Sequence, residues 1–459
     1  MSESICVIGA GLAGSEAALQ LGNHDTRVVL IEARPEVPTP VHKTHYCAEL
    51  VCSNSLKSEK EDSAAGLLKY ELKELGSFVY QCALEHRVPA GGALAVERDS
   101  FAQEVTSLIE SNEFIELIRA EVKTITSDAR VELSSGEVIG PFAAFIIATG
   151  PLTTDSFAEW LMKHTGQESL SFYDAAAPIV YADSLDMDKV FRQSRYEEGE
   201  GDYLNAPFEK DEYEAFINDL LEAKRVIAKD FESKDLFQAC QPIEEIARKG
   251  FDAPRYGPLK PVGLTDPHTG KRPWAAVQLR SEDKFGQSYN LVGFQTNLTF
   301  PEQERVFRMI PGLEHAEFSR YGVMHRNTFL DAPRLMSASQ EVKSFSKACG
   351  APVFLAGQIA GTEGYCEAIR SGLHAALSIL QFTHGHATAE LPPETVYGAL
   401  LAYATDPAVV EYQPMHVNFG IMPPLPEKIK NKGQRYAAYA QRAREALQTY
   451  RSVLEQELK

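Results

Sequence analysis

The first forty residues constrain the fold more than any other part of the chain. An apolar, strand-like run at 5–8 leads into a glycine-rich turn, a helical stretch at 15–21 and a second strand that ends at Glu32. Such glycines bring backbone N–H groups and a positive helix end against a pyrophosphate, while the acid accepts from ribose hydroxyls. The segment therefore predicts a dinucleotide-binding βαβ unit. The candidate residues in its turn are Gly9, Ala10, Gly11, Leu12, Ala13 and Gly14.

Two later segments indicate which dinucleotide is bound. Residues 145–150 form an apolar run that ends in Thr-Gly, and residues 353–358 form another that ends in Gly-Gln. With the first unit, they resemble the FAD-binding half of two-dinucleotide-domain flavoproteins, in which the late segment starts a helix aimed at the flavin. This resemblance adds further candidate cofactor residues, namely Thr149, Gly150, Gly357, Gln358, Gly361 and Tyr365.

The spacing of these motifs predicts the domain organisation. No second Gly-x-Gly-x-x-Gly follows a strand, so a dedicated NAD(P) domain is not expected. About two hundred residues separate the two later motifs, and they mix helical and strand-like patterns. We therefore predict an α/β fold, in which a Rossmann-like, glutathione-reductase-like FAD-binding domain (1–175 and 325–459) is interrupted by a mixed α+β substrate domain (176–324).

Charge limits how the chain can meet nucleic acid. It has 459 residues with 45 Lys and Arg against 64 Asp and Glu, a net charge of −19. This excludes a small basic nucleic-acid module, so RNA would have to meet a local basic face. Residues 427–459 depart from the trend, with eight basic residues against four acidic ones. Tyr436, Tyr439 and Tyr450 could stack on bases there, but a solvated helix that packs its tyrosines on the body is the preferred interpretation.

The compartment is expected to be the cytoplasm. No apolar run is long enough to cross a bilayer, and the N-terminus lacks a basic region ahead of a hydrophobic segment. The seven cysteines show neither a secreted disulfide pattern nor the close pairs of a zinc site, so reduced thiols and no metal are expected.

Two cysteine segments allow different chemistries. Cys47 and Cys52 have the C-x4-C spacing of flavin disulfide reductases, which makes a thiol-disulfide oxidoreductase a competing hypothesis, although Ser-Asn-Ser follows the second cysteine. Cys240 stands between polar residues just before a proline. A thiolate there could add to C6 of a uracil and make C5 nucleophilic, whereas a lone cysteine is more often a buried structural residue.

Ordered motifs extend along the whole chain. They are GAGLAGSE (9–16), RP (34–35), TP (39–40), AELVCSNS (48–55), VPAGGALAV (88–96), ATGPL (148–152), FYDAAAPIV (172–180), SLDMDK (184–189), YGPLKPVGL (256–264), GKRP (270–273), YGVMHRNT (321–328) and the glycine segment 357–365. With these motifs the chain resembles, end to end, the folate-dependent, FAD-containing tRNA (uracil-5-)-methyltransferase family.

The resemblance implies a reaction and its cofactors. A methylene would pass from 5,10-methylenetetrahydrofolate to C5 of a T-loop uridine in tRNA, and FADH2, regenerated by NAD(P)H, would reduce it to a methyl group. Cys240 would be the nucleophile for uracil C6, and Cys52 the second catalytic cysteine. Neither a membrane nor an obligatory protein partner is implied.

The resemblance also implies where folate binds. His325, Arg326 and Asn327 match the segment at the family's folate site, and Tyr365 would close the same pocket. Lys260, Lys271, Arg272 and Arg280 are candidates for contacts with tRNA phosphates, unless they are simply solvated charges.

Other functions remain open from the sequence. The same chemistry could act on ribosomal RNA, and a flavin thiol-disulfide oxidoreductase would require Cys47 for turnover. An FAD-stabilised RNA-binding protein would need neither Cys52 nor Cys240. A related flavoprotein family that modifies the anticodon wobble uridine with a GTPase partner resembles this chain mainly in its nucleotide-binding motifs.

Overall fold

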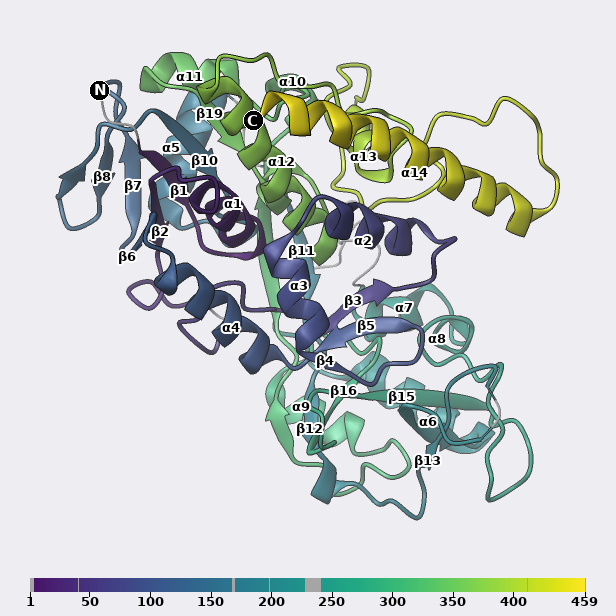
Figure 1. Ribbon diagram of the computed structural model, residues 1–459. Coiled ribbons are helices and arrows are strands. Elements are labelled where there is room, and N and C mark those ends of the chain that lie inside the picture. Colours follow the sequence, from purple (N-terminus) through teal and green to yellow (C-terminus); the bar gives the residue numbers. More distant parts are fainter. Residues whose placement is uncertain are drawn as a thin grey trace.

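The computed structural model describes residues 4–39, 41–166, 170–197, 199–227, 241–410 and 412–458; at 170–173, 325 and 326 only the backbone is described (Figure 1). Cys240 lies outside the described residues. Among the described helices, none combines the length and apolarity needed to span a bilayer.

A five-stranded parallel sheet forms the centre of the region built from both ends of the chain. Its strands, in spatial order, are β19 (Val353–Leu355), β10 (Ala144–Ile147), β1 (Ile5–Ile8), β2 (Val28–Glu32) and β6 (Ile115–Arg119). All residues of β1, β10 and β19 are buried, as expected for parallel strands covered on both faces. The predicted βαβ unit is confirmed, and the carboxyl ends of these strands meet at one edge.

Helices pack on this sheet and on one another. They are α1 (Leu12–Gly22), α2 (Ala64–Glu74), α3 (Phe78–Glu85), α4 (Arg98–Ser111), α5 (Asp155–Thr165), α10 (Ala332–Leu335), α11 (Lys343–Cys349), α12 (Tyr365–Thr383), α13 (Val396–Ala404) and α14 (Lys432–Glu457). Glu71 on α2 connects three of these helices. Its Oε2 lies 3.6 Å from Nε of Arg370 on α12 in a buried ion pair, and its Oε1 accepts from the N–H of Val396, the first residue of α13 (2.7 Å).

Two small antiparallel sheets complete this region. One has the order β3 (Ser55–Ser58), β5 (Ala93–Val96), β4 (Arg87–Val88), and the other the order β7 (Val122–Ile125), β8 (Val131–Leu133), β9 (Val138–Ile139). The second contains the hairpin that the sequence predicts at Ser135-Gly136, where Gly136 has a φ of +87°.

A separate antiparallel sheet lies in the middle of the chain. Its order is β13 (Phe191–Arg192), β14 (Tyr203–Phe208), β15 (Ala275–Ser281), β16 (Ser288–Leu291), β12 (Ile179–Tyr181), β17 (Phe318–Arg320). The helices α6 (Lys210–Glu222), α7 (Ile243–Lys249), α8 (Ala253–Tyr256) and α9 (Phe300–Phe307) accompany it. This region has its own hydrophobic core, which includes Phe208, Phe216, Phe294 and Phe307. The α/β fold with a mixed insertion therefore agrees with the prediction.

A two-stranded ladder connects the two regions. Strand β11 (Leu170–Ala175) pairs antiparallel with β18 (Met324–Phe329), immediately before and after the second sheet in the sequence. The two hydrophobic cores separate at this ladder. We therefore propose that the domain boundaries lie where the sequence predicts them, between residues 175 and 176 and between residues 324 and 325.

The fully buried carboxyl group of Glu244 on α7 should make stability depend on pH. Its oxygens accept from the backbone N–H of Asn297 (2.6 Å) and the hydroxyl of Thr296 (3.1 Å), and burial raises its pKa to about 7. Because the folded state binds this proton more tightly than the unfolded chain, the stabilisation is complete below the ordinary glutamate pKa and is lost as the pH rises to about 7.

We therefore expect Glu244→Gln to flatten the change in the free energy of unfolding between pH 5 and pH 8, measured by urea titration. Glu222→Gln, at an exposed position on α6, should keep the wild-type slope. Parallel pH profiles for the wild type and Glu244→Gln would contradict this assignment.

Candidate active site at the carboxyl edge of the parallel sheet

A cavity of about 1160 Å³ opens where β1, β10 and β19 end. The residues that follow these three strands line it, together with the loop around residue 52 and the start of α12. The predicted site residues in its wall are Gly9, Gly11, Leu12, Ala13, Glu32, Cys52, Thr149, Gly150, Gly357, Gln358 and Tyr365.

The three glycines of the first turn have different roles. Gly9 has a φ of +98°, and a Cβ there would lie 2.6 Å from the carbonyl oxygen of Ala148. A Cβ on Gly14 would lie 1.8 Å from the carbonyl oxygen of Gly9, so this glycine lets α1 pack on the turn. A Cβ on Gly11 would meet nothing within 4 Å, and Gly11 lines the cavity. The turn thus leaves an open backbone face at the helix N-terminus, as a pyrophosphate requires.

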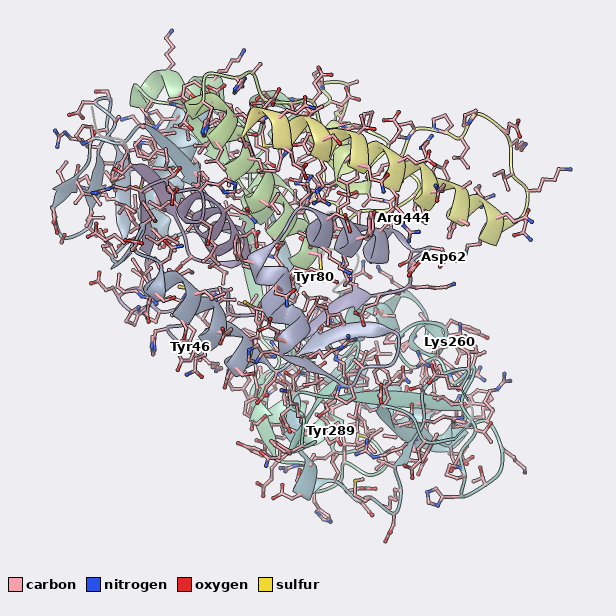
Figure 2. The ribbon with its side chains drawn as sticks, viewed as in Figure 1. Tyr46, Asp62, Tyr80, Lys260, Tyr289 and Arg444 are labelled. Atoms are coloured by element: carbon pink, nitrogen blue, oxygen red, sulfur yellow. The ribbon has the colours of Figure 1, made fainter. Side chains whose placement is uncertain are left out.

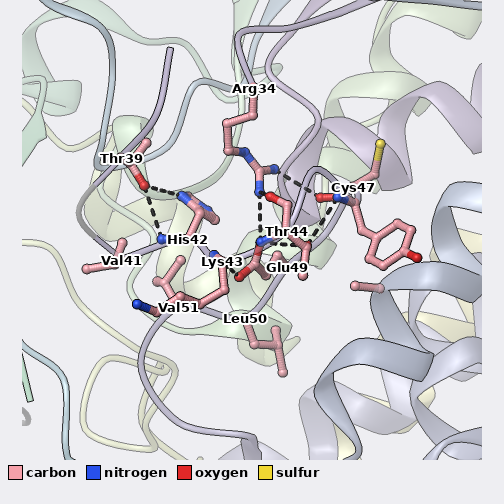
Figure 3. Close-up of polar contacts among 12 residues, drawn as sticks. Arg34, Thr39, Val41, His42, Lys43, Thr44, Cys47, Glu49, Leu50 and Val51 are labelled. Atoms are coloured by element: carbon pink, nitrogen blue, oxygen red, sulfur yellow. Dashed lines mark hydrogen bonds and ion pairs between the residues drawn. The ribbon is translucent and has the colours of Figure 1, made fainter. Parts of the chain in front are cut away.

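Glu32 is fixed at the end of β2 by two sets of donors. Its Oε2 accepts from the N–H of Ala10 (2.7 Å), and its Oε1 accepts from the N–H and Nε of Arg34 (3.1 and 2.8 Å). Arg34 also binds Oε2 of Glu49 (3.1 Å), which in turn accepts from the hydroxyl of Thr44 (2.8 Å; Figure 3). This network orients the Glu32 carboxylate at the cavity wall and was not predicted.

Tyr365, the first residue of α12, holds the Cys52 loop. Its hydroxyl oxygen accepts from the N–H groups of Cys52 (2.9 Å) and Ser53 (3.2 Å), across more than three hundred residues of sequence. The thiol of Cys52 is partly exposed and donates to the carbonyl oxygen of Ala175 (3.7 Å). Burial raises the pKa of Tyr365, so its phenol stays neutral.

A buried ion pair between Arg98 and Glu282 supports the same loop. Arg98 on α4 donates to the carbonyl oxygens of Leu50 (2.8 Å) and Cys52 (3.0 Å). Its guanidinium is paired with Glu282 at 2.6 Å, and the pKa of Arg98 is raised because the attraction of Glu282 exceeds the opposing effect of burial. A fixed positive charge therefore lies beside the Cys52 segment.

Two more arginines reach the loop from the second sheet. Arg280 on β15 donates to Oδ1 of Asn54 (2.7 Å) and to the hydroxyl of Ser53 (2.9 Å). Arg320 on β17 donates to the carbonyl oxygen of Val51 (2.5 Å). Arg280 is buried and committed inside the protein, so it is not available to RNA phosphates as the sequence suggested.

A cluster of charged groups borders the cavity beside the N-terminus of α12. Burial, and then the negative charge of Asp174, hold the pKa of Glu363 well above its usual range, and Glu363 accepts from Nε2 of Gln358 (2.6 Å). Lys57 lies 3.4 Å from Glu367. Burial opposes the charge of Lys57, but the two glutamates raise its pKa overall. Sequence reasoning missed this cluster, although both glutamates flank Tyr365, four positions apart.

The other cysteines near the site differ from Cys52. Cys47 is buried and is not among the residues that line the cavity; burial raises its pKa to about 11, and its sulfur accepts from Arg119 (3.8 Å). Cys366 lines the cavity, but burial raises its pKa to about 11. Within the described ranges, no group of three His, Cys, Asp or Glu residues could hold a metal ion.

Some predicted cofactor residues support the wall without lining it. Besides Gly14, these are Ala10, whose N–H binds Glu32, and Gly361. Gly361 has a φ of +82°, and a Cβ there would lie 1.8 Å from the hydroxyl of Tyr412, so packing explains this glycine.

The predicted folate residues lie on β18. The backbones of His325 and Arg326 pair with Asp174 and Tyr173 of β11. Asn327 is buried, and its Nδ2 lies 3.5 Å from Oδ2 of Asp174, while its Oδ1 accepts no hydrogen bond from a described residue. The β11–β18 ladder thus brings this segment to the cavity, which Asp174 and Thr328 line.

Known proteins resemble this chain over its full length. A sequence profile of the family described as "Glucose inhibited division protein A" matches residues 4–387. A protein of Moorella thermoacetica named "Methylenetetrahydrofolate--tRNA-(uracil-5-)-methyltransferase TrmFO" is 48% identical, over 97% of this chain and 98% of its own length. A protein of Geobacter sulfurreducens with the same name is 50% identical over 95% and 96%.

A solved structure of Aquifex aeolicus GidA has a TM-score of 0.70 and 14% sequence identity, and the match covers 97% of this chain and 73% of that one. At this identity the likeness concerns the fold, which supports the predicted α/β class. Taken with the identity to full-length relatives, the chain belongs to the glucose inhibited division protein A family and, within it, to the folate-dependent tRNA (uracil-5-)-methyltransferases.

Proposed function

We propose that this protein transfers a methylene from 5,10-methylenetetrahydrofolate to C5 of a T-loop uridine in tRNA and reduces it to a methyl group, with FAD as the bound flavin and NAD(P)H as its reductant. The observation that carries the proposal is the partly exposed Cys52 thiol in a large cavity with a dinucleotide-type turn. Full-length relatives bearing the enzyme's name support the reaction.

The cavity wall fits FAD. Its volume, about 1160 Å³, exceeds the roughly 300 to 1,000 Å³ of an ordinary small-molecule pocket, which suits a dinucleotide with a second ligand. Gly11 offers open backbone at the N-terminus of α1 for a pyrophosphate, and Glu32 presents a fixed carboxylate for a ribose. When bound and reduced by NAD(P)H, the flavin would supply the hydride that completes the methyl group.

Cys52 acts in this proposal as a thiol held at the reacting carbon. Tyr365 fixes its N–H and Arg98 its carbonyl, so the loop needs little rearrangement when substrate arrives. The protonated carboxyl that burial favours at Glu363 suits it to hold and return a proton during the chemistry at C5.

Cys240 is the proposed nucleophile for uracil C6. The N–H of Ile243 donates to the carbonyl oxygen of Gln295 (2.7 Å), and Gln295 lines the cavity. Ile243, three positions after Cys240 in the sequence, is thereby held beside a cavity-lining residue. Folate is proposed to bind along β18, where His325, Arg326 and Asn327 lie beside the cavity-lining Asp174.

The alternatives receive less support. A thiol-disulfide relay needs Cys47 beside the flavin, but that thiol is buried outside the cavity lining. Ribosomal RNA as substrate is not favoured by the names of the relatives, which specify tRNA.

Transfer of labelled carbon tests the proposal directly. With NAD(P)H present, label from methylenetetrahydrofolate should appear at C5 of the T-loop uridine of an unmodified tRNA transcript. Label elsewhere, or in ribosomal RNA alone, would contradict the proposed substrate.

A pair of glycine variants tests the flavin site. Gly11→Ala should fold normally but weaken FAD binding about tenfold, or ~1.4 kcal/mol, because its methyl group occupies the space proposed for the pyrophosphate. Gly14→Ala should destabilise the fold itself, because its Cβ meets the Gly9 carbonyl. The measurements are FAD affinity by fluorescence and the thermal midpoint of the apoprotein. Wild-type FAD affinity in Gly11→Ala would exclude this placement.

A pair of cysteine variants separates the two chemistries. Cys52→Ser should keep the flavin but lose methyl transfer by at least about a hundredfold. Cys47→Ala should retain transfer, since its thiol is outside the cavity lining. Loss of turnover in Cys47→Ala with normal flavin content would favour the thiol-disulfide alternative.

A further inference from the structure

The last part of the chain concentrates positive charge in an otherwise acidic protein. Between residues 428 and 444 there are six basic residues and no acidic one, whereas the whole chain has a net charge of −19. The basic residues are Lys428, Lys430, Lys432, Arg435, Arg442 and Arg444. Such a local reversal of sign attracts polyanions despite the repulsion from the rest of the surface.

Two of these residues attach α14 to the body. Arg442 donates to the carbonyl oxygens of Pro423 (2.6 Å) and Pro424 (3.0 Å). Arg444 pairs with Glu61 at 3.1 Å, on the side of α14 that faces the loop before α2 (Figure 2). All buried residues of α14 lie from Ala440 onward. The first turns of the helix therefore extend past the body, as Figure 1 shows.

The remaining cations form a basic patch, defined here as Lys428, Lys430, Lys432 and Arg435. The three lysines are exposed, and no ion pair among the described residues joins them to a carboxylate. Among the described residues, the guanidinium of Arg435 donates to the carbonyl oxygen of Ile429 (3.3 Å) and pairs with no carboxylate. Like charges held this close repel one another, and an anionic partner would relieve that repulsion.

Aromatic packing holds the patch in place. The ring of Phe419 lies 4.7 Å from that of Tyr436 and stacks at 5.4 Å on Tyr439. Lys432 and Arg435 lie over the Tyr436 ring, at 5.3 and 5.8 Å. The cations are thus presented from an ordered support, with two of them against one ring.

The segment before α14 connects the patch to the cavity wall. Met415 exchanges backbone hydrogen bonds with Gly361 (3.2 Å) and Glu363 (3.0 Å), and the N–H of Val417 donates to Glu367 (3.2 Å). Glu363 and Glu367 both line the cavity. This segment therefore fixes the position of the patch relative to the proposed reaction site.

We infer that the basic patch binds the phosphate backbone of the RNA substrate, away from the reacting uridine. This inference rests on the proposed function, because an RNA whose uridine enters the cavity carries a line of phosphates beyond it. Anionic phospholipid would match the charge but would have no reason to be anchored to a nucleotide cavity. Phosphate contacts of this kind position the substrate without reading its sequence.

The salt dependence of RNA binding tests the inference. The affinity of the flavin-loaded protein for an unmodified tRNA transcript is measured from 50 to 300 mM salt, for the wild type and for the triple variant Lys428→Ala, Lys430→Ala, Lys432→Ala. Each lost phosphate contact lowers the slope of log K against log salt by about 0.7 to 0.9, so the triple variant should have a slope smaller by about 2 to 3.

The matched control is the triple variant Lys163→Ala, Lys343→Ala, Lys347→Ala. These three lysines, on α5 and α11, are also exposed, and no ion pair among the described residues involves them. It changes the net charge equally, so its slope should remain that of the wild type. Equal slopes for the wild type and the patch variant would overturn the inference. An equal decrease of the slope in the patch variant and the control variant would also overturn it, because it would indicate an effect of net charge alone.

Two further results separate this inference from the proposed function. A patch variant with an unchanged slope in a protein that still methylates tRNA would refute the patch and leave the function standing. A wild type that binds no tRNA, but binds vesicles of anionic phospholipid through the three lysines, would refute both and assign the patch to a lipid surface.

Discussion

The close approach of helices α1 and α12 is the constraint on which the site depends. A Cβ on Gly372 of α12 would lie 2.0 Å from the carbonyl oxygen of Ala13 on α1, so no larger residue could occupy this crossing unchanged. Gly357 meets the same residue, since its Cβ would lie 2.9 Å from the Ala13 methyl group. This contact brings the N-termini of both helices to one cavity, where their partial positive charges favour anionic groups.

The second sheet contributes more than a substrate platform. The side chains of Arg280 and Arg320 extend from its strands and donate to the loop around Cys52. Glu282 forms an ion pair with a third arginine, Arg98. Removing one partner from such a buried pair leaves an uncompensated charge, which is costly, so the two regions are coupled through these contacts. The position of the Cys52 thiol therefore depends on residues from both sides of the domain boundary.

The distribution of charge distinguishes the basic patch from the rest of the surface. The acidic body repels polyanions over most of the surface, while the basic patch, just before and at the start of α14, offers a local place for a phosphate backbone. Tyr450, which the sequence offered as a base-stacking candidate, is instead buried in the contact between α14 and the body, as the preferred interpretation predicted. The partly buried Tyr439 stacks on Phe419, and the partly buried Tyr436 packs against the same ring at a tilt.

The sequence by itself determined the features that depend on local geometry and residue order. The glycine-rich turn, the βαβ unit, the insertion and the family followed from spacing and motifs, because a tight turn or a strand period is encoded within a few residues. Tertiary structure alone decided which distant side chains meet. The arginines around Cys52, the raised pKa of Glu363 and the burial of Cys47 depend on contacts between segments far apart in the chain, and on the desolvation that packing imposes.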